Sequence, residues 1–227
     1  MKKWISELKD WGTFFNKHLN DTKWAIIDKT QFPIVQSKSG ELYRIHQDLC
    51  TYKESYNQYN HKDIQVNDVI LDIGANIGAF SLLAAKKCRS VHAYEPVLFD
   101  VLRKNIELNV ANNIVPHCVA LGNGQPVEIN WQGQKVTVPS LRIGQMIDDA
   151  KGVSMIKLDA EGSEWSIEPE PLLKVHRIEI EFHRYSVKSK MSYGKFLLNE
   201  IYEMFETTNH YDPKTDTFWI SGVNRNV

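Results

Sequence analysis

Acidic side chains accompany three short apolar runs of the chain, where they could bind a ligand or accept a proton. Asp72 lies in the run 69–73, Glu95 ends the run 90–95, and Asp159 ends the run 153–159. Acids are rarely buried without a partner or a task. If the first and third runs are neighbouring parallel strands, their ends stand about 5 Å apart. We therefore expect Asp159 to lie beside Asp72 at one edge of a sheet.

A glycine turn follows the first of these acids. Gly74 and Gly78 let the backbone bend sharply and approach a ligand closely, and the helix after them offers free N–H groups. A dinucleotide-binding turn would need glycine at positions 74, 76 and 79, but Asn76 and Ala79 occupy the last two. The acid at Asp72 suits a cationic ligand. S-adenosylmethionine, with an ammonium, a sulfonium and one carboxylate, fits this pattern better than a diphosphate.

Two further positions could act on a nucleoside ligand. Glu95 follows the glycine turn by about 20 residues, the distance at which an acid can accept hydrogen bonds from ribose hydroxyls; an ordinary surface acid is the alternative. In the run 178–183, Glu181 and His183 face opposite to the apolar residues and reach the same edge as Asp159. His183 is a candidate general base, oriented by Glu181, and a structural histidine is equally compatible.

Two acids beside Asp159 have a second interpretation. Glu161 and Glu164 could be acids that stabilise the N-terminus of a helix. Carboxylate oxygens suit Mg²⁺, but nothing in the spacing fixes a coordination geometry, so we assign no metal ligand.

The alternation of apolar runs and helical patterns predicts an α/β fold. Residues 68–121 follow a β-α-β-α-β order, the unit of a parallel sheet. Ser140 is expected to cap a short helix. The predicted strands are 24–28, 42–46, 69–73, 90–95, 114–121, 127–131, 135–138, 153–159, 177–183 and 217–221. The predicted helices are 4–15, 52–59, 77–88, 97–106, 140–149, 165–175 and 194–206, the sixth of them interrupted by prolines.

Composition limits the possible classes of protein. The chain has 227 residues, of which 42% are hydrophobic, and a formal net charge of -1. A net charge this small creates no strong electrostatic attraction to nucleic acid. The three cysteines form no CxxC pair, which is typical of a reducing compartment. Because no apolar run approaches about 20 residues and the spaced apolar residues near the N-terminus do not form the apolar core of a signal peptide, we expect a cytoplasmic protein without a membrane span.

Six segments resemble the FkbM-type methyltransferases in order and spacing: VILDIGANIGAFS, HAYEP, KNIELN, VALGNG, IKLDAEGSE and IEIEFH. The resemblance covers 68–183. It implies a Rossmann-like class I methyltransferase fold, with a mostly parallel central sheet, helices on both faces and S-adenosylmethionine as cofactor. The cofactor-binding residues that it implies are Asp72, Gly74, Asn76, Gly78, Glu95, Pro96, Ala120 and Asp159, with Asn123 near the adenine.

From these observations we expect an enzyme that methylates a hydroxyl group of a sugar or another small molecule, with Asp159, His183 and Glu181 as its catalytic residues. The expected partner is this small-molecule acceptor, with a glycan among the candidates, and no nucleic acid. The alternatives are a nucleic-acid or protein N-methyltransferase and a non-catalytic nucleoside-binding domain. We expect an N-terminal helical and aromatic cap over 1–60 and the methyltransferase domain over 61–227. The sequence does not indicate an oligomeric state.

Overall fold

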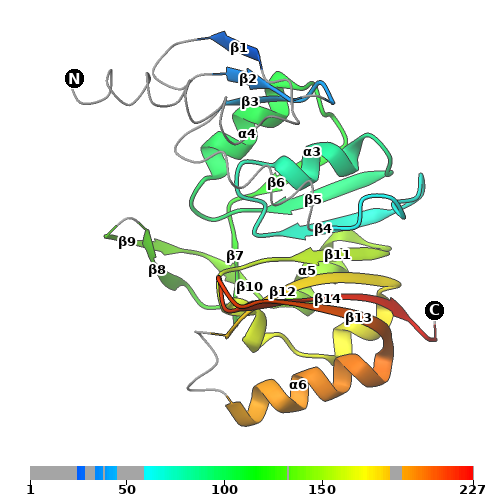
Figure 1. Ribbon diagram of the computed structural model, residues 1–227. Helices are drawn as coiled ribbons and strands as arrows, with labels where there is room; N and C mark the ends of the chain where they lie inside the picture. Colours follow the sequence, from blue (N-terminus) through cyan, green and yellow to red (C-terminus); the bar gives the residue numbers. More distant parts are fainter. Residues whose placement is uncertain are drawn as a thin grey trace.

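A computed structural model describes residues 25–28, 34–37, 39–44, 59–131, 133–184 and 191–226. Within these residues, the largest element is a sheet of seven strands (Figure 1). From one edge to the other, its strands are β13 (Phe205–Asp212), β14 (Thr217–Asn224), β12 (Arg177–His183), β11 (Met155–Leu158), β4 (Val69–Ile73), β5 (Ser90–Tyr94) and β6 (Ile114–His117).

The strands from β12 to β6 run parallel to one another, and β14 and β13 add an antiparallel pair at the other edge. The prediction of a mostly parallel α/β sheet is therefore confirmed. The chain returns from β6 at one edge to β11 beside β4. This crossover puts the ends of β4 and β11 side by side, as expected for Asp72 and Asp159.

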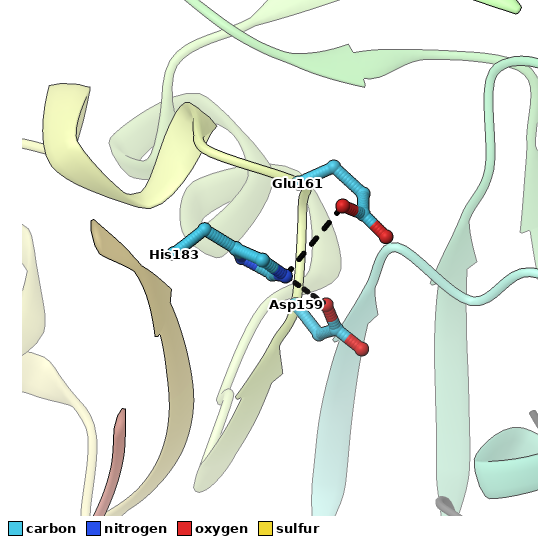
Figure 2. Close-up of side chains that lie close together, drawn as sticks. All are labelled: Asp159, Glu161 and His183. Atoms are coloured by element: carbon cyan, nitrogen blue, oxygen red, sulfur yellow. Dashed lines mark ion pairs between the residues drawn. The ribbon is translucent and has the colours of Figure 1, made fainter. Parts of the chain in front are cut away.

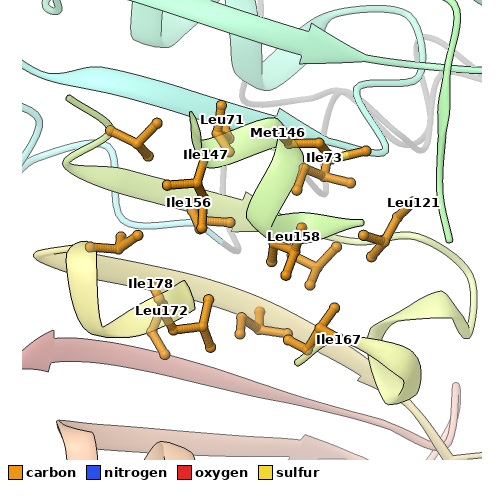
Figure 3. Packing of buried hydrophobic residues seen from close by; sticks show 14 of the residues in the cluster. Leu71, Ile73, Leu121, Met146, Ile147, Ile156, Leu158, Ile167, Leu172 and Ile178 are labelled. Carbon is orange, nitrogen blue, oxygen red and sulfur yellow. The ribbon is translucent and has the colours of Figure 1, made fainter. Parts of the chain in front are cut away.

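Helices cover both faces of the sheet because apolar side chains alternate along its central strands. Ile70 of β4 packs with α3 (Ala79–Ala85) and α4 (Phe99–Leu108), whereas Leu71 and Ile73 pack on the opposite face. Figure 3 shows this second layer, in which Met146 and Leu172 approach the sheet. The elements of that layer are α5 (Ile143–Ala150), the 3₁₀ turns η1 (Ser163–Ser166) and η2 (Glu170–Lys174), and α6 (Met191–Met204).

Three small sheets accompany the large one. Strands β1 (Ala25–Asp28), β2 (Ile34–Gln36) and β3 (Leu42–Arg44) are antiparallel. The side chains of Asn105 and Asn109 on α4 bond to the backbone of β3. Strands β8 (Val127–Trp131) and β9 (Gln134–Val138) form the predicted hairpin. Strands β7 (Ala120–Leu121) and β10 (Ser140–Leu141) pair in parallel.

Several local predictions were wrong. Ser140 does not cap a helix: it lies in β10, its hydroxyl bonds to the backbone at Gly124 and Gln125, and α5 begins only at Ile143. The predicted strand 114–121 is two strands, β6 and β7. The segment predicted as helix 165–175 forms two short 3₁₀ turns, since the prolines there remove backbone donors. Residues 4–15 and 52–58 lie outside the described residues, so the predicted cap stays a prediction.

Strand β13 has no counterpart among the predicted elements, which end a helix at residue 206 and resume with a strand at 217. Its sequence, FETTNHYD, is polar and mostly exposed, so it lacks the apolar alternation that marks a strand. Among the described helices, none combines the length and the apolar character that crossing a membrane requires.

The turn after β4 passes very close to the end of β11. Gly74 has a φ of +78°, and a Cβ atom added to it would stand 1.7 Å from the carbonyl oxygen of Asp159. Gly133, in the β8–β9 turn, has the same φ of +78° but no atom within 4 Å of such a Cβ. The two positions therefore share the backbone strain of a side chain at positive φ and differ only in the steric contact.

We predict that Gly133→Ala costs roughly 1–2 kcal/mol of stability, the price of the left-handed backbone alone. Gly74→Ala should cost about 1–3 kcal/mol more, because the ends of β4 and β11 must separate. Urea unfolding of both variants measures the difference. Equal losses of unfolding free energy would show that the close approach of the two strand ends contributes nothing.

Candidate active site

A buried lysine joins the ends of β4 and β11. Lys157 Nζ donates a hydrogen bond to the carbonyl of Gly74 at 2.9 Å and lies 3.2 Å from Asp72 Oδ1 and 3.8 Å from Asp159 Oδ2. Burial would lower the pKa of Lys157, but the charges of Asp72 and Asp159 outweigh it and raise that pKa. The fully buried Asp72 also accepts a bond of 2.5 Å from the Ser81 hydroxyl. Lys157 is therefore a permanent cation that holds two acids and the glycine turn together.

Glu95 connects the end of β5 with the same turn. Its Oε2 accepts the backbone N–H of Asn76 at 2.9 Å, and its Oε1 accepts those of Val97 and Leu98 at 2.7 and 2.8 Å. Burial raises the pKa of Glu95, although these three N–H groups act in the opposite direction. Because a carboxylate oxygen has two lone pairs, Oε2 keeps one acceptor position beyond its bond to Asn76.

His183, at the end of β12, is surrounded by carboxylates. Figure 2 shows its ring together with Asp159 and Glu161, whose side chains point toward it. Nε2 of His183 lies 3.6 Å from Glu161 Oε2 and 3.9 Å from Asp159 Oδ1, and Nδ1 lies 2.5 Å from Oε1 of the buried Glu164. Burial would lower the pKa of His183, but its bond to Glu164 and the nearby charges raise the pKa to about 9.

At neutral pH, His183 is therefore an imidazolium ion. It has no free lone pair, so it would act as a base only after losing this proton at higher pH. Asp159, Glu161 and His183 also offer one possible metal-ligand atom each, all within 4.8 Å of one another. A metal ion and a proton would compete for the same histidine nitrogen. Nothing beyond this spacing indicates an ion at these described residues, so we assign no metal to the cluster.

Tyr59 bridges two carboxyl groups of the site. Its hydroxyl lies 3.0 Å from Asp159 Oδ2 and 3.2 Å from Glu181 Oε2. Burial, with the charge of Asp159 second, raises the pKa of Glu181 to about 7. Burial and these two acids also raise the pKa of Tyr59. Lys157 Nζ lies 5.2 Å from the centre of the Tyr59 ring. Tyr59 therefore belongs to the acidic site, and its role is not limited to hydrophobic packing of the N-terminal segment.

The polar face predicted for β12 is present. Glu179, Glu181 and His183 lie opposite Ile178 and its apolar neighbours, and Glu179 bonds to the Ser221 hydroxyl of β14 at 2.6 Å. Burial raises the pKa of Glu179 to about 7. Sequence reasoning assigned no role to Lys157, although a lysine inside the apolar run 155–158 is an unusual feature. Tyr59 ends the predicted helix 52–59, to which the sequence analysis gave no catalytic role.

The remaining predicted residues have fewer described contacts. Asn76 and Gly78 follow Gly74 in the turn, and both have positive φ. The carbonyl of Pro96 lies 3.8 Å from Cys118 Sγ, and the backbone N–H of Ala120 donates to the carbonyl of residue 139. Asn123 is exposed. The structure brings Asp72, Gly74, Glu95, Asp159, Glu181 and His183 to one edge of the sheet.

Comparison with known proteins places the fold among the methyltransferases. An rRNA methylase from Streptococcus thermophilus superposes with a TM-score of 0.51 at 7% identity, covering 77% of this chain and 94% of that one. The methyltransferase-like protein SMU.1697c of Streptococcus mutans, in complex with SAH, has a TM-score of 0.52 at 11% identity, covering 79% of this chain and 99% of that one. The predicted Rossmann-like methyltransferase fold is confirmed.

Two curated relatives match shorter segments. The tRNA (guanine(37)-N(1))-methyltransferase Trm5b of Pyrococcus abyssi is 39% identical over 70 residues, which are 30% of this chain. A probable ribosomal RNA small subunit methyltransferase A of Methanosphaera stadtmanae is 44% identical over 54 residues, which are 23% of this chain. The chain spans 20% of the length of each. No protein-family profile matches it, so the likeness to the FkbM type stays a resemblance.

These relatives correct one expectation. The sequence analysis predicted a small-molecule acceptor from the resemblance to the FkbM type, and no nucleic acid because the net charge is close to zero. Both relatives carry the names of RNA methyltransferases, which contradicts that assignment of partners. Net charge was a poor guide because it sums the whole surface, whereas contacts to RNA depend on local groups.

We predict that the stability of the protein falls as the pH rises from 6.5 to about 9, the ordinary and the folded pKa of His183. Because the folded pKa is raised, this stabilisation is complete below the lower value and is lost as pH passes the upper one, up to about 3 kcal/mol. Urea unfolding at several pH values measures it.

His183→Gln should remove most of this slope, whereas His210→Gln, at an exposed histidine of β13, should keep it. If the stability of His183→Gln depends on pH as steeply as that of the unaltered chain, His183 is not the titrating group.

Proposed function

We propose that this chain is an S-adenosylmethionine-dependent methyltransferase that acts on a base nitrogen of RNA. The similarity to Trm5b, a tRNA guanine-N(1) methyltransferase, carries the choice of acceptor. The methyltransferase fold and the acids at the carboxyl edge of the sheet support the reaction class.

The residues at this edge fit the proposed cofactor. Glu95 keeps one acceptor position on Oε2 for a ribose hydroxyl, and three backbone N–H groups hold its carboxylate in place. Gly74 and Gly78 supply the positive φ angles at the two ends of the turn that carries the Asn76 N–H group. Asp159 supplies negative charge suited to a sulfonium or ammonium group. When bound, S-adenosylmethionine supplies an electrophilic methyl group, and the protein aligns the acceptor with it.

The acids also favour a particular kind of acceptor. Asp159, Glu161, Glu164 and Glu181 are hydrogen-bond acceptors when ionised, and only Lys157 and His183 oppose their charge in the contacts described above. This surplus of negative charge repels phosphate, but it suits the edge of a nucleic-acid base that presents N–H donors. A base that leaves its stack can enter such a site while the phosphates remain outside. Asp159, whose backbone carbonyl lies against the glycine turn and whose carboxylate accepts a hydrogen bond from Tyr59, is our candidate for the base that takes the acceptor's proton.

We predict that the purified chain transfers tritiated methyl groups from S-adenosylmethionine to tRNA or rRNA, with the label recovered in a base after nucleoside digestion. Asp159→Asn should lower this rate about 100-fold or more, because it removes the proposed proton acceptor. Asp148→Asn, at an exposed acid of α5 paired with Lys174, is the matched control. Label in ribose, or none in RNA, would refute the proposed acceptor.

We also predict that Glu95→Gln weakens the binding of S-adenosylhomocysteine about 10- to 100-fold. The amide replaces an ionised acceptor, and hydrogen bonds to a charged group contribute about 1.5–3 kcal/mol. Isothermal calorimetry measures the dissociation constant, and Glu107→Gln, at an exposed acid of α4, should leave it unchanged. Equal affinities in all three proteins would exclude Glu95 from the cofactor site.

A further inference from the structure

Three oxygen atoms from distant parts of the chain form a short hydrogen-bonded line. Asp159 Oδ2 lies 3.0 Å from Tyr59 Oη, which lies 3.2 Å from Glu181 Oε2. A phenol carries one proton, and an ionised carboxylate carries none. The phenol can donate to only one carboxylate at a time, so the second contact is a hydrogen bond only when a carboxyl group brings its own proton.

Glu181 is the member of this line that can hold a proton near neutral pH, since its pKa is about 7. The groups that face it are the negative Asp159 from β11, the hydroxyl of Tyr59, the cationic His183 with Nε2 at 3.9 Å from Glu181 Oε1, and Thr217 with Trp219 on β14. Lys157 Nζ lies 5.2 Å from the centre of the Tyr59 ring and 3.8 Å from Asp159 Oδ2. With Glu181 protonated, Glu181 donates to Tyr59 and Tyr59 donates to Asp159.

We propose that Asp159, Tyr59 and Glu181 form a proton relay that carries the acceptor's proton away from the site of methyl transfer. This inference rests on the proposed function. In the reaction, the acceptor nitrogen gains the methyl group as the sulfonium carbon–sulfur bond breaks, and its N–H proton passes to Asp159. Asp159 returns a proton to the Tyr59 oxygen while the original phenol proton moves to Glu181. Glu181 then releases it to water before the next turnover.

The relay gives the three residues different tasks. Asp159 is the catalytic residue, since it meets the acceptor's proton. Tyr59 and Glu181 act through it as positioning residues, because they restore its negative charge. The relay starts only when Glu181 is ionised, so the rate should rise with pH through the pKa of Glu181.

The first test is the pH dependence of kcat with RNA as substrate. The unaltered chain should show a rise with a midpoint near 7. Tyr59→Phe keeps the ring against Phe80 but breaks the line, so we expect kcat to fall about 10-fold or more, the midpoint near 7 to disappear and KM to change little. Glu179→Gln is the control: the residue lies on the same strand and face but bonds to Ser221, and this variant should keep the midpoint. A Tyr59→Phe enzyme with the original profile would overturn the relay.

The second test needs no RNA. The protein is labelled with ¹³C at tyrosine Cζ, and the Tyr59 resonance is assigned as the one that is missing in Tyr59→Phe. Its chemical shift should change in a step near pH 7. Glu181→Gln should abolish this step, and Glu179→Gln should leave it. A Tyr59 resonance that is constant across the neutral range would overturn the relay, whatever the acceptor is. Conversely, a clear step in a protein that methylates no RNA would refute the proposed function and leave the hydrogen-bonded line of Tyr59 and Glu181 in place.

Discussion

Burying carboxylates at the junction of two parallel strands requires a cation within the sheet itself, and Lys157 provides it. Its ammonium group faces Asp72 on β4, the carbonyl of Gly74 in the next turn and Asp159 at the end of its own strand. An isolated buried charge would cost several kcal/mol. Here Lys157 places a positive charge beside both acids. This one side chain thus links β4, the glycine turn and the end of β11.

The distribution of charge across the edge of the sheet follows from the register of its strands. In the strand register, Lys157 lies opposite Asp72 on one side and opposite Glu179 on the other. Glu181 and His183 follow Glu179 on the same face of β12, two and four residues later. The two cations are therefore interleaved with the acids, and each has a different environment. Lys157 stays charged, His183 holds its proton through Glu164, and Glu181 titrates near neutrality. The ends of these neighbouring strands thus bring groups with different pKa values close together.

Local sequence patterns predicted the parts of this arrangement that depend on neighbours in the chain. The apolar runs ending in acids gave the correct strands for Asp72, Glu95 and Asp159, and the alternation along 178–183 gave the correct polar face. The contacts of Lys157 depend on strand register, which is not encoded locally, and Tyr59 meets Asp159 across 100 positions. Strand β13 was missed because it is polar and acquires its form by pairing with β14. The partner was mispredicted because net charge says nothing about individual contacts.

The strand order has a consequence for synthesis on the ribosome. Strand β4 is buried along its whole length between β5, which follows directly in the chain, and β11, which begins only at Met155. A nascent chain can therefore assemble β4, β5 and β6 while the other side of β4 has no strand to pair with. That open, apolar edge is the kind of surface that recruits other chains into aggregates. Chaperone protection during translation would matter most while the segment between residues 121 and 155 is being made.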